Sequence, residues 1–475
     1  MAIDTEHPEY IKRKTQWEKL RDCVEGQETV HSKGKKYLPG LSGQETADYN
    51  AYKQRATFYG ATSRTVDGLS GMVFRKAPIV EVPEGLNPLV EDVTLDGLTL
   101  VDFAEQLIDD DIVVGRAGIL VDHPITMANT TKAQAEATNI RPFLKHYTAE
   151  QIFNWKTESR NNAQIVTHVR LYEWVDVPGD DEFESEQVKQ IRVLDLNELD
   201  QYRQRVFQLN KKKEWVQVGD DMIPLKGAKP LDFVPFFFVG VKNGSPMCEK
   251  PPLIDMANVN LSHYITTADL EHGAHFTGLP TAVITGHQDD DPEKPAEYRI
   301  GAATAWVFPN PETEAFYLEF QGSGLESLEK RLTKKEEYMA FLGARMLSPD
   351  KKGVEAAETA QIHRAGEMSV LASLTNSCAR SLEQAVQFMA EWAGINGDVS
   401  IKLNTDFMAI KMSAQDLMAL FQTYQGGGMA FSDFLFNLKR GEIIQEDREE
   451  DDVRSEIETS NPFNALDMVP GGDNG

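Results

Sequence analysis

Two stretches of helical periodicity, with a short alternating stretch between them, constrain the fold of this chain more than any other feature. The first, 253–276, follows Pro251-Pro252, a natural helix start, and ends before Gly278 and Pro280. The second, 325–347, carries a near-heptad apolar seam made of Leu325, Leu328, Leu332, Met339, Leu342 and Met346. Between them, 281–285, 304–308 and 315–320 predict short strands. The sequence therefore predicts a small β-rich insertion held between two helices that pack against other helices.

An earlier block, about 76–245, has the pattern of a mainly antiparallel sheet. Short alternating runs at 78–82, 118–122, 166–175, 189–196, 201–208 and 214–218 are separated by polar turns. A helix is predicted at 100–114. The apolar run 233–241 predicts a buried strand, because it is about half as long as a bilayer crossing requires. This block predicts an α+β domain.

Helices are also predicted before this block. Periodicity at 10–24 indicates one helix, which a Gly/Lys/Pro stretch ends, and 46–74 indicates another. The second is poor in large apolar residues at first and contains Gly60, Gly68 and Gly71. We expect these glycines to let it pack closely against another helix.

The last part of the chain is predicted to be largely helical. A helix at about 356–393 would be roughly 55 Å long at 1.5 Å per residue. Its predicted seam is Leu371, Leu374, Cys378, Leu382, Ala385, Met389 and Trp392. A strand at 399–403, a helix pair around 426–428 and an acidic tail at 446–458 follow. We expect about the last fifteen residues to be mobile.

Composition excludes several classes of protein. The chain has 475 residues, enough for about three domains, and a formal net charge of −27, which would repel phosphate backbones over most of the surface. A tight nucleic-acid binder is therefore not expected. Cys23, Cys248 and Cys378 fit free thiols in a reducing compartment. Without a signal peptide or a membrane-length apolar run, we expect a soluble, intracellular protein.

Motifs for catalysis are weak. Gly34-Lys35-Lys36 lacks the upstream glycine and the following Ser/Thr of a phosphate-binding loop, and no Gly-x-Ser-x-Gly elbow is present. A possible metal group comprises His263, Asp269, Glu271, His272 and His275, but its spacing matches no zinc motif, and a polar helix interface is the favoured interpretation. The carboxylates at 109–111, 289–291 and 449–452 are interpreted as solvated charge in loops or at helix ends. We expect no metal and no cofactor.

Basic residues are sparse, so their clusters carry information. Lys330, Arg331, Lys334 and Lys335 lie on successive turns of the 325–347 helix, and Lys351-Lys352 lie in the loop after it. One interpretation is pairing with Glu326, Glu329, Glu336 and Glu337 within the helix. The other is transient contact with a phosphate backbone, and the sequence leaves both open.

The order of these parts resembles the portal protein of tailed bacteriophages. The segments that carry the resemblance are Thr65-Val-Asp-Gly-Leu-Ser-Gly-Met-Val-Phe-Arg-Lys, Gly115-Arg-Ala-Gly-Ile-Leu-Val-Asp, Ala268-Asp-Leu-Glu-His-Gly-Ala-His-Phe-Thr-Gly-Leu-Pro-Thr, and Glu358-Thr-Ala to Gly366-Glu. They look like one portal family that long carried only an uncharacterised-domain label. The likeness runs from about residue 45 to 455, and its specificity lies in the number and order of the segments.

The resemblance implies a portal-type α+β fold with named parts. They are an N-terminal helical arm (1–58), an α/β wing (59–250), a two-helix stem (251–277 and 324–346), a small β-rich clip (278–323), a tunnel loop (347–356), a long tunnel helix with the return strand of the wing (357–412), a helical crown (413–460) and a mobile tail (461–475).

The resemblance also implies a function without catalysis. The chain would form a ring, as a dodecamer, at one capsid vertex of a virion assembled in the host cytoplasm. The ring would conduct double-stranded DNA without tight binding during genome packaging, retention and ejection, and an acidic channel suits sliding. The implied partners are the terminase large subunit, a head-tail connector or adaptor protein, and the major capsid and scaffolding proteins, with no membrane. In that frame Lys351, Lys352, Lys330 and Lys334 are candidate lumen contacts. The alternatives are another virion adaptor or minor capsid protein, and a metal-dependent hydrolase.

Overall fold

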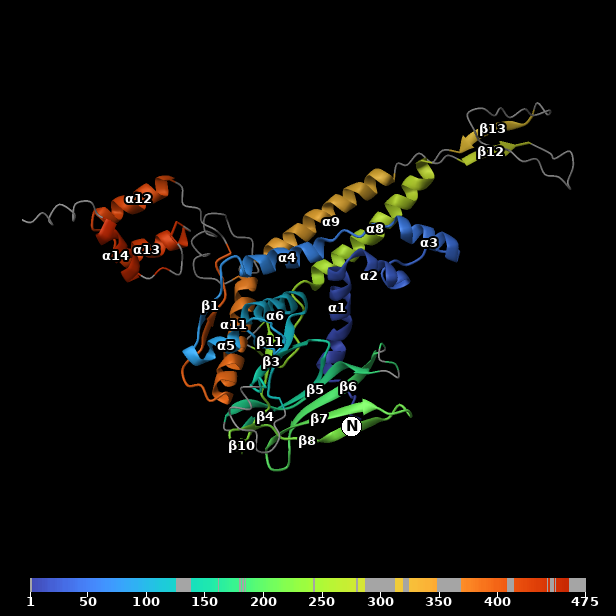
Figure 1. Cartoon of the computed structure of the whole chain (residues 1–475). Helices are drawn as coiled ribbons and strands as arrows, with labels where there is room; N and C mark the ends of the chain where they lie inside the picture. The colour runs from blue at the N-terminus through green and yellow to red at the C-terminus, as the bar shows by residue number, and fades with distance from the viewer. Residues whose placement is uncertain are drawn as a thin grey trace, which may run out of the picture. The chain divides into compact units, whose positions relative to one another are not determined.

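The structure is a computed structural model that describes most of the chain. The described residues are 2–124, 138–160, 162–178, 181, 183, 185–241, 244–278, 281–286, 312–318, 324–347, 369–407, 414–441, 443–444, 448 and 450–460. Contacts divide the chain into two compact units, Met1–Thr405 and Asp406–Gly475 (Figure 1).

The first unit combines helices with antiparallel sheets. Its helices are α1 (Pro8–Glu25), α2 (Gln27–Ser32), α3 (Thr46–Arg55), α4 (Ala61–Val73), α5 (Asn87–Val90), α6 (Leu100–Val114), α8 (Ile254–Gly278), α9 (Leu325–Arg345) and α11 (Val370–Trp392). Its strands are β1 (Ile79–Glu81), β2 (Arg116–Asp122), β3 (Phe143–Thr148), β4 (Ile152–Arg160), β5 (Ala163–Pro178), β6 (Ser185–Leu196), β7 (Tyr202–Leu209), β8 (Trp215–Met222), β9 (Leu225–Lys226), β10 (Lys229–Pro230), β11 (Phe236–Gly240), β12 (Thr281–Thr285), β13 (Glu314–Leu318) and β14 (Ser400–Lys402). This mixture confirms the predicted α+β class.

The strand block forms two main sheets. Strands β4 to β8 make a five-stranded meander in chain order, and β11, β2 and β3 make a second sheet with β2 in the middle. Each described pairing is antiparallel. The predicted strands at 78–82, 118–122, 166–175, 189–196, 201–208, 214–218 and 233–241 are all confirmed, whereas β3 and β4 were not predicted.

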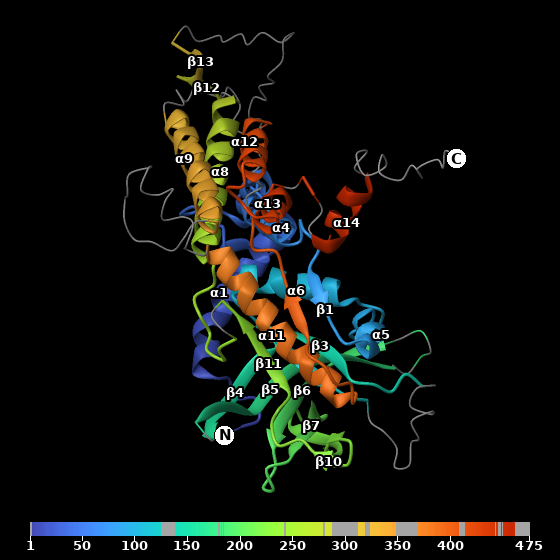
Figure 2. The same cartoon turned by 90° about the vertical axis from the view of Figure 1, so that its left-hand side faces the viewer.

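The core of this unit lies where α6 and α11 pack on the three-stranded sheet. The predicted seam of α11 is buried along its described length, from Leu371 to Trp392. Figure 2 shows α11 running alongside β11 and β3. The predicted helix 100–114 corresponds residue for residue to α6. The first part of the predicted 356–393 helix lies outside the described residues.

The two main sheets meet through a polar network. The Glu173 carboxylate on β5 accepts hydrogen bonds from Lys145 Nζ and Tyr147 Oη, each at 2.6 Å, and from Gln190 Nε2 at 2.7 Å. Arg192 Nε also donates to Glu173, at 3.2 Å. Buried charges are tolerated when they are paired and hydrogen-bonded in this way, so this network joins the sheets.

The predicted helix 46–74 is wrong as one element, because the chain is extended at 56–60 between α3 and α4. Tyr59 O there accepts a 2.7 Å hydrogen bond from Asn260 Nδ2, and the Phe58 ring meets Tyr264 edge-on at 5.9 Å. These contacts to α8 replace helical hydrogen bonds. The packing role predicted for Gly68 and Gly71 is also wrong, since no described part of the chain comes within 4 Å of a methyl carbon added at either position.

The second unit contains α12 (Ala414–Gln425), α13 (Phe431–Arg440) and α14 (Glu450–Ser460). The predicted helix pair around 426–428 is confirmed by α12 and α13. Tyr424 stacks on Phe434, with ring centroids 4.6 Å apart, and joins the two helices. Glu450, Asp451 and Asp452 occupy the first turn of α14, where negative charge stabilises a helix.

Among the helices of the described residues, none is both long enough and apolar enough to cross a bilayer. The three cysteines are buried free thiols, as expected.

Candidate functional site

The helix pair α8 and α9 carries most of the candidate metal-binding and DNA-contacting residues that the sequence analysis named. Figure 1 shows the two helices side by side, and their contacts run antiparallel. Near one end, a methyl carbon added to Gly273 would lie 2.7 Å from Leu325 Cδ2; near the other, one added to Gly343 would lie 3.4 Å from Met256 Cε. Glycine at these two positions lets the helix backbones approach closely. The predicted two-helix packing is confirmed.

Polar contacts made by side chains fix the register of α8 against α9. Lys335 Nζ on α9 donates to Ser262 O at 2.7 Å and to Thr266 Oγ1 at 2.6 Å, both on α8. His263 Nε2 lies 3.1 Å from Glu336 Oε1. Burial and the nearby Arg331 charge lower the pKa of Lys335. This lysine is thus a structural cross-link between the helices.

The possible metal group on α8 turns toward other helices. Asp269 accepts a 2.6 Å hydrogen bond from Tyr52 Oη on α3, and His275 Nε2 lies 3.1 Å from Arg55 Nη2 of the same helix. The His272 ring meets the Tyr52 ring edge-on at 5.3 Å. Among the described residues, no three His, Cys, Asp or Glu side chains are arranged to hold a metal ion. The interpretation of this stretch as a polar helix interface is confirmed.

The four candidate lysines divide into two groups. Lys330 and Lys334 are exposed on α9, and Lys330 Nζ lies 2.6 Å from Glu326 Oε1, four residues earlier on the helix. This ion pair is of the predicted intrahelical kind, and such exposed pairs contribute little to stability. Lys351 and Lys352 lie outside the described residues.

The outer face of α9 carries a stripe that the sequence analysis missed. We call it the α9 stripe: Arg331, Lys334, Tyr338, Phe341 and Arg345. These residues follow one another at intervals of three or four, so they share one side of the helix. Tyr338 and Phe341 are 50% and 59% exposed, and their rings stack with centroids 6.3 Å apart. The sequence held a signal for it, because four of its five residues, all except Lys334, stand one position before a residue of the apolar seam.

Packing explains why segment 115–122 contains two glycines and an arginine. Gly115 ends α6 at φ 72°, and a methyl carbon there would lie 3.1 Å from both Pro252 and Val241. Gly118 lies under the Phe236 ring, where a methyl carbon would be 2.2 Å away. The Arg116 guanidinium is buried 4.2 Å from the Trp155 ring and 4.8 Å from the Phe238 ring, and it donates to Pro246 O.

The interpretation of 109–111 as solvated carboxylates is wrong. These residues lie in α6, which α1, α4 and α11 surround, and three consecutive helical residues cannot all face water there. Asp110 accepts from Arg21 at 2.6 Å and lies 2.8 Å from His146 Nε2. Asp111 is fully buried, and neither carboxyl oxygen has a hydrogen-bond partner among the described residues.

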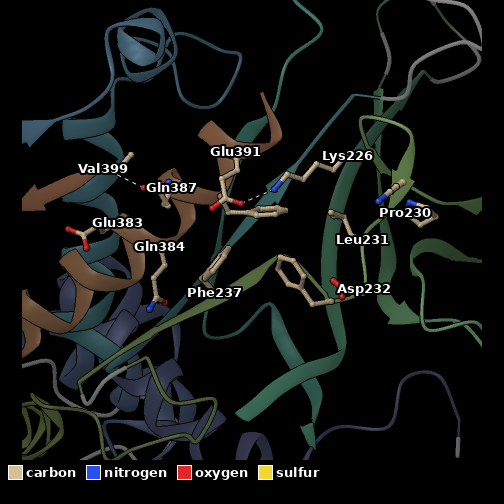
Figure 3. Close-up of a pocket in the computed structure, with 13 residues that line it drawn as sticks. Lys226, Pro230, Leu231, Asp232, Phe237, Glu383, Gln384, Gln387, Glu391 and Val399 are labelled. Atoms are coloured by element: carbon tan, nitrogen blue, oxygen red, sulfur yellow. Dashed lines mark hydrogen bonds and ion pairs between the residues drawn. The ribbon is translucent and has the colours of Figure 1, made fainter. Parts of the chain in front are cut away.

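A cavity of about 800 Å³ opens between α11 and the β9–β10 hairpin (Figure 3). Phe237, Leu231 and Val399 contribute its apolar surface. Lys226 Nζ and Glu391 Oε2 pair at 2.7 Å across it, as the dashed line in Figure 3 marks.

The polar groups of this cavity serve the fold. Gln387 Oε1 accepts from Val399 N at 2.9 Å, and Glu383 Oε2 accepts from Ile401 N at 3.0 Å, so both hold β14 against α11. The described residues that line the cavity include no Ser, Cys or His. Its walls can hold an apolar side chain, but they offer no nucleophile paired with a base.

Comparison with known proteins gives a partial match. The family model of a domain of unknown function (DUF4055) matches residues 252–393, which is less than half of the chain. This region spans α8, α9 and α11. A search of curated proteins finds no match.

Solved structures give distant likenesses. The chain is 12% identical to a chain of the neck of an empty GTA particle computed with C6 symmetry, covering 83% of this chain and 92% of that one, with a TM-score of 0.38. A chain of the virion of the native gene transfer agent (GTA) particle is likewise 12% identical, with 86% and 96% covered and a TM-score of 0.38. Similarity at this level assigns neither fold nor function to the chain.

Proposed function

We propose that the chain is a structural component of a phage-type head-tail particle, and that it acts there as a portal protein without enzymatic activity. It would form a ring at one capsid vertex that conducts double-stranded DNA. The ring would also dock the terminase, the head-tail connector and the capsid and scaffolding proteins. The resemblance of segments 65–76, 115–122 and 268–281 supports this proposal, as does the antiparallel helix pair that flanks β12 and β13.

The observation that carries the proposal is the exposed α9 stripe. Tyr338 and Phe341 form two exposed, stacked aromatic rings on the outside of a long helix. Aromatic residues are enriched at the interfaces where proteins associate. On the other flank of α9, Glu326, Glu329, Glu336 and Glu337 supply negative charge. A helix with Tyr338, Phe341 and Arg345 on one side and acids on another is suited to head-to-tail contact, which generates rings. In this proposal Lys334 lies outside that contact.

Charge supports a conduit rather than a tight DNA binder. A net charge of −27 per chain disfavours close contact with phosphates, so DNA can slide past such a wall. Lys351, Lys352, Lys330 and Lys334 are the proposed exceptions, which would contact DNA transiently from the tunnel loop and the stem. For Lys330 the ion pair with Glu326 weakens its field.

The test of the conduit is genome packaging in particles that carry lysine variants. We expect Lys351→Ala/Lys352→Ala particles to form normally but to package or retain DNA several-fold less well than wild type. Lys330→Ala/Lys334→Ala should have a smaller effect in the same direction. Lys211→Ala/Lys212→Ala, at the exposed turn between β7 and β8, removes the same charge as a control. Normal packaging and retention in both lysine variants would contradict the assignment of these lysines.

A further inference from the structure

Residues 2–7, which we call the strap, lie against the outer face of the five-stranded sheet. In both views the N-terminus lies at this sheet (Figures 1 and 2). The strap has the sequence Ala-Ile-Asp-Thr-Glu-His, so it is short and carries two acids. It runs directly into α1, which begins at Pro8.

The sheet holds the strap mainly through the strap's backbone. Arg170 Nη1 on β5 donates to Ala2 O at 3.2 Å and to Ile3 O at 2.9 Å. Asn154 Nδ2 on β4 donates to Thr5 O at 2.8 Å, and His7 N donates to Phe153 O at 2.8 Å. Within the strap, Thr5 N donates to Ala2 O at 3.2 Å, so residues 2–5 form a turn. Donors that contact backbone carbonyls accept peptides of many sequences.

The two acidic side chains of the strap, Asp4 and Glu6, also interact with polar and basic groups of the protein. Asp4 Oδ2 accepts from Trp215 Nε1 at 3.3 Å. Glu6 pairs with Lys14 Nζ at 2.6 Å. Glu6 and Asp4 are also the charges that act on Lys189, whose ammonium lies 3.6 Å from the centre of the Tyr172 ring. The face therefore favours negative groups on the segment that lies on it.

Beside the strap the same face is open. Trp174 pairs with Lys189, and Leu209 with Trp215, in the strand registers, and the alternation along β5 to β8 places all four on one side of the sheet. Trp174 is 61% exposed and Leu209 is 44% exposed. We call Asn154, Arg170, Tyr172, Trp174, Lys189, Leu209 and Trp215 the strap face. A face of aromatic and basic side chains is complementary to acidic groups, and it differs from the average surface of a chain with a net charge of −27.

We propose that the strap face is a docking site for a short, acidic, turn-forming segment of a partner protein, and that the strap occupies it until that segment displaces it. The strap shows the chemistry the face recognises: backbone carbonyls for Arg170 and Asn154, and a carboxylate for Trp215. A nucleic acid would supply phosphates but no carbonyls in the spacing that these donors meet. The strap's few hydrogen bonds, several of them partly exposed, make it displaceable.

The test uses the full chain and a labelled synthetic peptide, Ala-Ile-Asp-Thr-Glu-His, with binding followed by fluorescence anisotropy. In Asp4→Lys/Glu6→Lys protein the contacts of the strap's acids with Trp215 and Lys14 are lost and Lys189 meets like charge. The strap keeps its backbone contacts but is held more weakly, and we call this protein the vacated variant. We expect this variant to bind the peptide at least tenfold more tightly than wild type. Adding Arg170→Ala or Trp215→Phe should reverse the gain. The peptide with Asn and Gln in place of its acids should bind at least tenfold more weakly.

Four results would overturn the proposal. The first is equal affinity of wild type and the vacated variant for the peptide, and the second is equal affinity for the acidic and the neutral peptide. The third is peptide binding that survives Arg170→Ala, and the fourth is a single-stranded oligonucleotide that binds more tightly than the peptide with the same residue dependence. Self-association of wild type that Asp4→Lys/Glu6→Lys abolishes would assign the occupant to a second copy instead. Circular dichroism and thermal melts of each variant separate loss of docking from loss of folding, with Trp215→Phe as the conservative substitution.

Discussion

Glu173 is the residue at which the contact between the two main sheets depends most on ionisation. Burial alone would raise its pKa, but the charges of Arg192 and Lys145, and hydrogen bonds from Lys145 and Tyr147, bring the pKa of Glu173 to about 2. Its ordinary value is 4.5. As the pH falls, the unfolded chain therefore takes up this proton at a higher pH than the folded chain does. The stabilisation that ionised Glu173 provides is complete above pH 4.5 and is lost as the pH falls toward 2.

We predict that Glu173→Gln costs about 3 kcal/mol at neutral pH, because it leaves Lys145 and Arg192 without their buried partner. Below pH 4.5 the difference from wild type should shrink, since wild type loses the same interaction there. Urea unfolding at several pH values measures this. Glu186→Gln, exposed on β6, is the control and should change little. A Glu173→Gln defect that is independent of pH would contradict the ionic account.

Asp111 shows the opposite behaviour. Full burial, with the charges of Asp110 and Glu249 nearby, raises the pKa of Asp111 well above its usual range. The folded chain thus binds this proton more tightly than the unfolded chain, and stability falls as the pH rises above the unfolded value. We predict that Asp111→Asn stabilises the protein at pH 7 by roughly 1 kcal/mol or more.

The comparison that tests this is thermal unfolding of wild type and Asp111→Asn between pH 4.5 and 8. The advantage of the variant should grow with pH. Asp102→Asn, in the exposed first turn of the same helix, removes the same charge and should destabilise slightly through loss of its contact with Thr99. A variant that is less stable than wild type throughout would show that the carboxylate has a role beyond its burial.

At the scale of elements, strong periodicity predicted the structure well. Helices α6, α8 and α9 followed from their apolar spacing within a few residues. Strand β4 was not predicted because its first four residues are buried and the rest exposed, so alternation is lost at a register shift. The break at 56–60 depends on Asn260 and Tyr264, which are far away in sequence.

The candidate site was predicted in part. The helix pair and the pairing of Lys330 with Glu326 were accessible from spacing alone. The role of Lys335 was not, because it depends on which side of α9 faces Ser262. Burial of Asp110 and Asp111 was missed for the same reason: a run of carboxylates gives no sign of how many helices surround it.

The α8–α9 pair gives a prediction that separates the inner seam from the α9 stripe. Met339 is buried in the seam, so Met339→Ala should destabilise the protein by about 2–5 kcal/mol. Tyr338→Ala, its exposed neighbour, should change the free energy of unfolding by less than about 0.5 kcal/mol in dilute protein. Chemical denaturation compares the two. Equal losses would place Tyr338 in the core of the chain rather than at an association surface.

At the scale of the whole molecule, the division after Thr405 predicts independent folding of the first unit. A chain of residues 1–405 should unfold cooperatively with a melting temperature within a few degrees of the full protein. A chain that ends at Ile395 should be much less stable, because it lacks β14, which pairs with β1 and binds Gln387 and Glu383. Calorimetry of the three proteins tests this, and a 1–405 chain that fails to fold would contradict the division.

Ring formation is the central claim, and negative-stain electron microscopy of the purified full chain tests it most directly. We predict rings with a central hole when particles are viewed down their symmetry axis, and a loss of rings in Tyr338→Ala/Phe341→Ala protein that remains folded. A monomer or dimer at high concentration, across a range of salt, would contradict the conduit.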